Sequence, residues 1–211
     1  MNLKLCAGVA GTVVLAASSA MAQSSVPVGS YVQVNLGAGV AGQTEVSVSS
    51  PTGSGSQDAD VDAGFFGSVA VGRNFDNNVA VEAELLYGKN DIDTADIDRV
   101  LGFNLDASVK TTAVMANVYY NVGGLGPINA RIGAGVGYGQ SEYELLGESD
   151  KGDGVMWQVL VGGAYPINDK VSLDVGYRYL RAPEYELSDA GTKVSAETGA
   201  HVVTLGARFG F

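Results

Sequence analysis

An alternation of period two runs through most of this chain and constrains its fold more than any other feature. Between residues 31 and 211, eight segments of about ten residues alternate apolar side chains with polar or small ones, which indicates β-strands with two different faces. These segments are roughly 31–40, 62–72, 79–87, 110–122, 128–139, 155–165, 171–180 and 200–211. None of the residues on their apolar parity is Asp, Glu, Lys or Arg when the fourth segment is counted from Val114 to Val122. The pattern predicts an all-β fold whose strands each have one uncharged face.

The length of these segments fits a membrane. A strand tilted by about 45° needs about 9 to 11 residues to cross the hydrocarbon core of a bilayer. Aromatic residues on the apolar parity favour the segment ends, as they do in the interfacial girdles of membrane barrels. We expect the girdles to contain Tyr87, Tyr138, Trp157 and Tyr179 toward the long connections, and Tyr120, Tyr165, Phe209 and Phe211 toward the short ones.

The connections between the segments alternate in length. Three are tight and rich in turn-forming residues (RNFDNN, GGLGP and PINDK), whereas the other four are long and polar. We therefore predict an eight-stranded antiparallel up-and-down transmembrane β-barrel with periplasmic turns and extracellular loops. The alternative is a soluble sandwich or lipocalin-like barrel, whose strands would also alternate. In that case the long connections should not all fall at one end, and the aromatic residues should favour mid-strand positions.

The first residues have the features of a secretory signal peptide. Lys4 gives a positive start, residues 5–17 are mostly apolar, and Ala20-Met21-Ala22 has the form of a cleavage site. The apolar part is shorter than the ~20 residues that a membrane-spanning helix needs. We expect residues 1–22 to be cleaved, residues 23–28 to form a short lead, and residues 29–211 to form the barrel. The only cysteine, Cys6, lies in the predicted signal peptide, so we expect neither a disulfide nor a cysteine metal site.

Charge narrows the range of partners. The net charge of -11 makes nucleic acid an unfavourable partner. Most acidic residues fall in the four long connections, where solvated, mutually repulsive loops are the default interpretation. Such loops could contact host or cell-surface ligands, and divalent cations could bridge them to lipopolysaccharide phosphates. The stretch DIDTADID lacks the glycine and the closing glutamate of an EF-hand, so we expect no dedicated calcium site and no cofactor.

Six charged residues lie on the opposite, inward parity of the predicted strands. The interior of an eight-stranded barrel is only wide enough for side chains to fill it, so these charges should meet one another rather than bulk water. We predict that they form a charge-compensated lumen network: Glu82, Glu84, Arg131, Asp174, Arg178 and Arg208. A catalytic pair at Glu82 and Glu84 would need a route for substrate, which a plugged lumen does not offer. We therefore expect no catalytic residues and no enzyme activity.

Several stretches resemble a known family. ANVYYNVGGLGPINARIGAGVGYG, VSLDVGYRYL and LGARFGF are similar to the small eight-stranded OmpA-like and opacity-type surface-antigen barrels, often called the porin family. This resemblance implies a monomer in the outer membrane, inserted by an assembly machinery that reads the last strand, with Phe209 and Phe211 as the signal. The chain stops at Phe211 without the peptidoglycan-binding domain of long OmpA-type proteins, so cell-wall anchoring is not expected. Lipid A deacylases have a serine two residues after their histidine. In this chain Val203 stands two residues after the only histidine, His201, so the sequence does not have the deacylase pattern.

Two functions remain open at this point. The first is a structural, surface-exposed barrel with acidic extracellular loops that contributes to envelope integrity or to surface interactions. The second is a narrow porin-like channel for small solutes.

Overall fold

The computed structural model describes residues 27–50, 53–61, 64–91, 107–145, 148–181, 185–189 and 192–211. It describes side chains for residues 27–39, 64–90, 108–123, 126–142, 151–181 and 199–211. The predicted signal peptide and most of the lead therefore lie outside the described residues, as do several acidic residues of the long connections.

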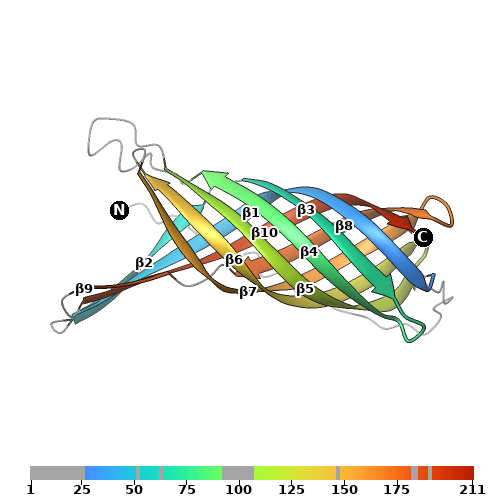
Figure 1. Cartoon of the computed structure of the whole chain (residues 1–211), viewed down its shortest axis with the longest axis horizontal. Helices are drawn as coiled ribbons and strands as arrows, with labels where there is room; N and C mark the ends of the chain where they lie inside the picture. The colour runs from blue at the N-terminus through green and yellow to red at the C-terminus, as the bar shows by residue number, and fades with distance from the viewer. Residues whose placement is uncertain are drawn as a thin grey trace, which may run out of the picture.

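The described residues form ten antiparallel β-strands (Figure 1). Their bounds are β1 (Gly29–Ser50), β2 (Gly53–Val61), β3 (Phe65–Asn74), β4 (Val79–Asp91), β5 (Ala107–Leu125), β6 (Ile128–Leu145), β7 (Glu148–Pro166), β8 (Val171–Arg181), β9 (Tyr185–Asp189) and β10 (Thr192–Gly210). Eight of them pair in the order β1-β3-β4-β5-β6-β7-β8-β10, and β10 pairs with β1 to close the sheet. The predicted eight-stranded antiparallel barrel is confirmed.

Several strands are longer than the alternation of apolar residues predicts. The ladder between β1 and β10 runs from Tyr31 opposite Gly210 to Ser49 opposite Lys193, with a β-bulge between Gly39 and Ala41. Beyond this bulge, β2 pairs with β1 and β9 pairs with β10, so a four-stranded sheet projects past the barrel (left in Figure 1). The prediction treated much of this region as loop because its sequence is polar. Backbone pairing does not need an apolar face, so the strands continue into water.

Short turns connect the strands at the opposite end of the barrel. In the turn between β7 and β8, the Asn168 carboxamide oxygen accepts hydrogen bonds from the backbone N–H groups of Lys170 and Val171, both at 2.9 Å. The backbone N–H of Phe211 donates to the carbonyl oxygen of Ser30 at 2.9 Å, which joins the last residue to the first strand. The short connections and both described chain ends therefore share the end that we call the turn end, and the long connections share the loop end.

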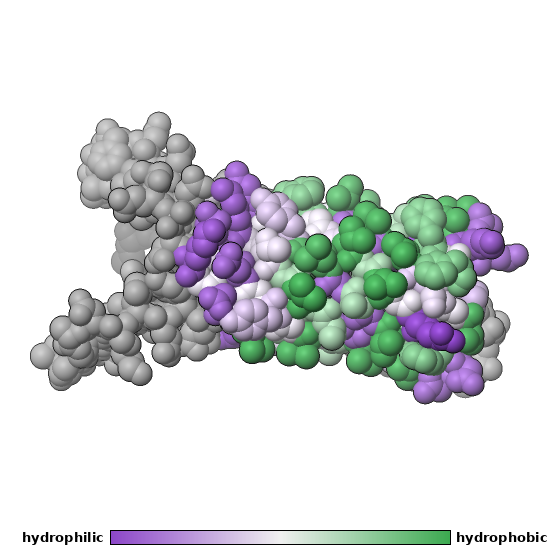
Figure 2. Space-filling model, in the orientation of Figure 1, coloured by the Kyte–Doolittle hydropathy of each residue, from purple (hydrophilic) through white to green (hydrophobic). Residues whose placement is uncertain are grey.

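The outer surface carries the residues of the uncharged parity. Many aliphatic side chains are about half exposed there, such as Val69, Val118, Val161 and Leu173. Figure 2 shows these apolar residues as a band with hydrophilic residues beyond it on both sides. Within the described ranges, no helix is long and apolar enough to cross a bilayer.

Candidate functional site

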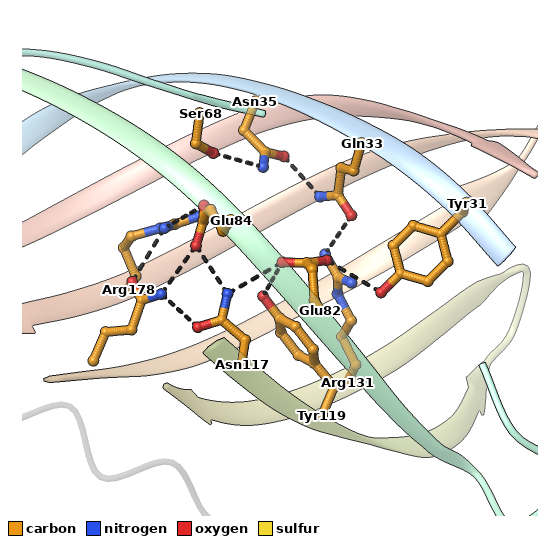
Figure 3. A network of polar contacts seen from close by, with 11 residues as sticks. Tyr31, Gln33, Asn35, Ser68, Glu82, Glu84, Asn117, Tyr119, Arg131 and Arg178 are labelled. Carbon is orange, nitrogen blue, oxygen red and sulfur yellow. Dashed lines mark hydrogen bonds and ion pairs between the residues drawn. The ribbon is translucent and has the colours of Figure 1, made fainter. Parts of the chain in front are cut away.

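All six charged residues of the predicted lumen network lie inside the barrel. Their exposed fractions do not exceed 8%. They come from strands β4, β6, β8 and β10 and form two groups, with Glu82 between them. Figure 3 shows four of the six: Glu82, Glu84, Arg131 and Arg178.

The first group is an ion pair between β4 and β8. The guanidinium Nη1 of Arg178 lies 2.9 Å from Oε1 of Glu84, and the two side chains are 5% and 0% exposed. The other carboxylate oxygen of Glu84 accepts hydrogen bonds from the amide groups of Asn117 (2.9 Å) and Gln158 (3.0 Å). Gln158 also accepts a hydrogen bond from Arg178 at 3.1 Å. The buried pair thus has additional hydrogen bonds that offset its desolvation.

The second group places two arginines on one carboxylate nearer the turn end. Oδ1 of Asp174 lies 2.7 Å from Nη2 of Arg208 and 3.2 Å from Nη2 of Arg131. The carboxamide oxygen of Gln33 accepts hydrogen bonds from both arginines at 3.2 Å. Ser172 donates to the second oxygen of Asp174 at 3.2 Å. Gln33 therefore accepts hydrogen bonds from the two arginines in addition to those that the single carboxylate of Asp174 accepts.

Glu82 lies between these two groups and is held by neutral donors. The hydroxyl groups of Tyr31 (3.1 Å) and Tyr119 (3.3 Å) and the amide of Asn117 (3.2 Å) all donate to its carboxylate. Since Asn117 also donates to Glu84, its amide links Glu82 to the first group. The two tyrosines connect Glu82 to the second group, because Arg131 lies over the ring of Tyr119 and Arg208 over that of Tyr31.

Each lumen arginine also lies over an aromatic ring. The guanidinium carbon of Arg131 is 4.4 Å from the ring centroid of Tyr119, that of Arg178 is 4.5 Å from Phe66, and that of Arg208 is 4.6 Å from Tyr31. A cation over a ring face gains electrostatic energy, and more where water is excluded. The sequence analysis missed these three partners, although their position on the inward parity could have revealed them.

An apolar layer covers the network toward the loop end. Its members are at most 7% exposed: Phe66, Leu86, Ala113, Met115, Met156, Leu180 and Val202. On β4, Leu86 follows Glu84 by two residues toward the loop end, and on β8, Leu180 follows Arg178 in the same way. The prediction for the inward parity did not include this apolar layer. It separates the Glu84–Arg178 pair from water at the loop end.

Glycines of β6 make room for the inward side chains of β5. Gly133, Gly135 and Gly137 lie directly opposite Tyr119, Asn117 and Met115 in the ladder. A Cβ atom at Gly135 would collide with the carboxamide oxygen of Asn117. The alternate glycines of GAGVGYG therefore serve side-chain packing.

We expect Gly135→Ala to destabilise the barrel by about 1 to 3 kcal/mol, because the added methyl group displaces the amide that links Glu82 and Glu84. Denaturant titration of the refolded protein measures this loss. Gly88→Ala is the matched control, since a Cβ there meets nothing closer than the Phe65 carbonyl oxygen at 3.8 Å. An equal loss in both variants would contradict a packing role specific to Gly135.

Free space inside the barrel is unevenly distributed. Within the network, a void of about 20 Å³ is lined by residues such as Gln33, Arg131 and Arg178. That volume holds little more than one water molecule, which needs about 10 to 15 Å³. At the turn end, a cavity of about 300 Å³ ends on Tyr31, Arg131 and Arg208. The network and the apolar layer therefore fill the middle of the lumen, while the turn end is hollow.

The structure places the predicted interfacial aromatic residues on the outer surface. Toward the loop end, the rings of Trp157 and Tyr179 lie 5.6 Å apart, and the hydroxyl of Tyr138 donates to Asp153. The remaining predicted aromatic residues are also on the outside: Tyr87, Tyr120, Tyr165, Phe209 and Phe211.

His201 lies in this outer aromatic group rather than in the lumen. Its ring is 4.9 Å from that of Tyr179, and its Nδ1 forms a hydrogen bond of 2.5 Å with the hydroxyl of Tyr177, a residue that the sequence analysis did not include. No set of three His, Cys, Asp or Glu residues in the described part of the chain is placed to hold a metal ion.

Comparison with known families agrees with this architecture. Residues 10–209 match the model of the outer membrane protein beta-barrel domain. The chain belongs to this family. Its location in the outer membrane, expected from the alternation and the girdles, is thereby confirmed.

The curated relatives of this outer membrane barrel match only part of the chain. Uncharacterised proteins of Brucella abortus and Brucella suis are 34% identical over 92 residues, which is 37% of this chain and 32% of each relative. The match therefore spans about a third of the length of these relatives.

Among solved structures, OprG from Pseudomonas aeruginosa is 14% identical, with a TM-score of 0.55, covering 87% of this chain and 96% of OprG. Neisserial surface protein A is 20% identical, with a TM-score of 0.51, covering 86% of this chain and 97% of its own. At these identities the likeness concerns the fold alone.

Proposed function

We propose that this outer membrane barrel is a structural surface protein, which contributes to envelope integrity or to surface interactions through its acidic loop end. The observation that carries the proposal is the filled middle of the lumen, where the void among the charged residues measures about 20 Å³. A solute path would require the network and the apolar layer to move apart. The buried pair of Glu84 and Arg178 opposes such movement, because separating its charges leaves both without compensation.

The proposal extends to the parts of the chain whose roles are inferred. Residues 1–22 serve as the export signal, residues 29–211 form the barrel unit, and the mature protein works as a monomer. The six lumen charges stabilise the barrel instead of catalysing a reaction. Phe209 and Phe211 mark the last strand for the assembly machinery, and the outer aromatic residues anchor the barrel at both interfaces.

A narrow channel is the second candidate function. The cavity of about 300 Å³ at the turn end favours it, because the cavity extends as far as Arg131 and Arg208 and leaves only the network and the apolar layer as a barrier. Charged side chains within a polar lumen can also select ions.

Planar-bilayer recording separates the two functions. We expect the refolded wild-type barrel to show no steady conductance, since protein atoms fill the middle of the lumen. The double variant Met115→Ala/Met156→Ala thins the apolar layer and should increase brief current steps. A stable open current through the wild-type protein would overturn the structural proposal and support the channel.

A further inference from the structure

A cavity of about 300 Å³ lies among the short turns at the turn end of the barrel. Its inner end consists of Tyr31, Arg131 and Arg208. Apolar residues from the start of β1, the end of β7 and the start of β8 form much of its wall: Pro27, Val28, Ala164, Pro166 and Val171. Pockets for small molecules measure about 300 to 1,000 Å³ and combine mostly apolar walls with a few polar groups. The cavity therefore has the size and the lining of a site for a small molecule.

Two buried polar atoms beside this cavity have no hydrogen-bond partner. In the part of the chain that the structure describes, Nη1 of Arg131 and Oδ1 of Asn74 are the only such side-chain atoms. Both residues line the cavity and are at most 8% exposed. Nη2 of Arg131 contacts Asp174 and Gln33. Nδ2 of Asn74 donates to the Pro27 carbonyl oxygen at 3.3 Å, so each of the two side chains is satisfied on one side only. A buried polar atom without a partner costs free energy, which a bound molecule that pairs with it would recover.

The charges around the cavity favour an anion at its inner end. The hydrogen bonds of Arg208 within the network use its Nε and Nη2, so its Nη1 takes part in neither of them. Neither Asp174 nor Glu82 lines the cavity, so a ligand there would contact the guanidinium groups and not these carboxylates. The other charged groups that line the cavity are exposed, and water and salt screen them: Lys170, Asp169 and the chain end at Phe211.

We propose that the turn-end cavity binds a small organic acid that carries a hydroxyl group and an apolar group. Its carboxylate accepts hydrogen bonds from Nη1 of Arg131 and from Arg208, and such charge-assisted hydrogen bonds are stronger than neutral ones. The hydroxyl donates to Oδ1 of Asn74, and the apolar group packs on Val28 and Val171. A hydroxyl suits this position better than an ammonium group, which the two guanidinium groups would repel. The inference goes beyond the structural role proposed above and holds whether or not the lumen conducts.

Isothermal titration calorimetry of the full mature chain in detergent tests this site with related probes. Mandelate has a carboxylate, a hydroxyl and an apolar ring, whereas phenylacetate lacks the hydroxyl and phenylethylene glycol lacks the carboxylate. We expect the wild type to bind mandelate about tenfold more tightly than phenylacetate, because phenylacetate leaves Asn74 without a donor. The glycol should bind more weakly than mandelate by at least the same factor. In Asn74→Ala the preference for mandelate over phenylacetate should disappear, and a preserved preference would refute the contact with Asn74.

A second pair of variants locates the binding within the molecule. Ala164→Leu places a larger side chain in the cavity without removing a charge, and it should weaken mandelate binding by about tenfold or more because it fills volume that the ligand needs. Ala83→Leu makes the same change on the outward face of β4 and should bind mandelate as the wild type does. The heat-dependent gel shift verifies that all variants are folded.

Four other results would each overturn the proposal. The first is the absence of saturable mandelate binding by the wild type, since the cavity would then hold water alone. The second is equal binding of the three probes, which would indicate apolar packing without recognition of the acid. The third is undiminished binding by Ala164→Leu, which would place the ligand elsewhere. The fourth is binding that requires removal of residues 23–26, because that part of the lead would then be the occupant of the cavity.

Discussion

Replacing Arg178 by alanine is expected to lower the free energy of unfolding of the barrel by about 3 to 5 kcal/mol. The substitution leaves the Glu84 carboxylate, which is fully buried, without the guanidinium 2.9 Å away. It also removes the cation over the Phe66 ring and opens space beneath the apolar layer. Urea titration of the barrel in lipid vesicles measures the loss, and the temperature of the gel shift in detergent should fall with it.

Two further variants distinguish the ion pair from a general loss of side-chain volume. Arg181→Ala removes an arginine from the outer face of the same strand, and such a partly exposed charge should contribute no more than about 1 kcal/mol. The double variant Glu84→Gln/Arg178→Met removes both charges and should be more stable than Arg178→Ala. If the double variant is no more stable than the single one, the two charges do not stabilise each other.

Replacing Phe211 by alanine is expected to reduce the amount of assembled barrel in cells severalfold. This prediction follows from the proposed role of the last strand as an assembly signal, which requires an aromatic side chain rather than the backbone alone. Phe211 is 77% exposed, so its side chain contributes little to packing within the barrel. Its backbone hydrogen bond to Ser30 persists in the variant. Membrane fractions analysed by the heat-dependent gel shift measure the assembled fraction.

The control for this variant is Phe65→Ala, which removes an outward ring of 53% exposure near the loop end of β3. It should assemble normally. Refolding into detergent, where no machinery acts, should proceed equally for both variants and the wild type. A refolding defect confined to Phe211→Ala would show that this residue stabilises the barrel, and it would contradict its role as an assembly signal.

The period of two was sufficient to predict the barrel. In each transmembrane strand, residues such as Val69 and Val161 face out, while their neighbours face the lumen. The alternation in the sequence therefore predicts the barrel. It does not predict the projecting sheet, since β2 and the second half of β1 consist mostly of polar or small residues. Their pairing depends on backbone hydrogen bonds, which every sequence without proline can form.

The members of the lumen network could be identified from parity, but their pairing could not. Glu84 pairs with Arg178, which lies 94 residues away, because the stagger of the barrel brings β4 and β8 to the same level. Glu82, Arg131 and Asp174 are each the fourth residue of their strand. The carboxylate of Glu82 nevertheless accepts hydrogen bonds from Tyr31, Tyr119 and Asn117. Stagger is a property of the whole closed sheet, so no single strand reveals it.

The seam between β1 and β10 has a consequence for how the molecule folds. It joins Tyr31 to Gly210, so the final ladder can form only once the whole sequence is available. Contacts of such high sequence separation make folding slow, because the entropy of bringing the two ends together is lost before they interact. Until then both border strands expose unpaired amides, which hydrocarbon does not tolerate. The rate at which the cylinder closes, rather than the strength of any one contact in it, should therefore limit how fast this protein matures.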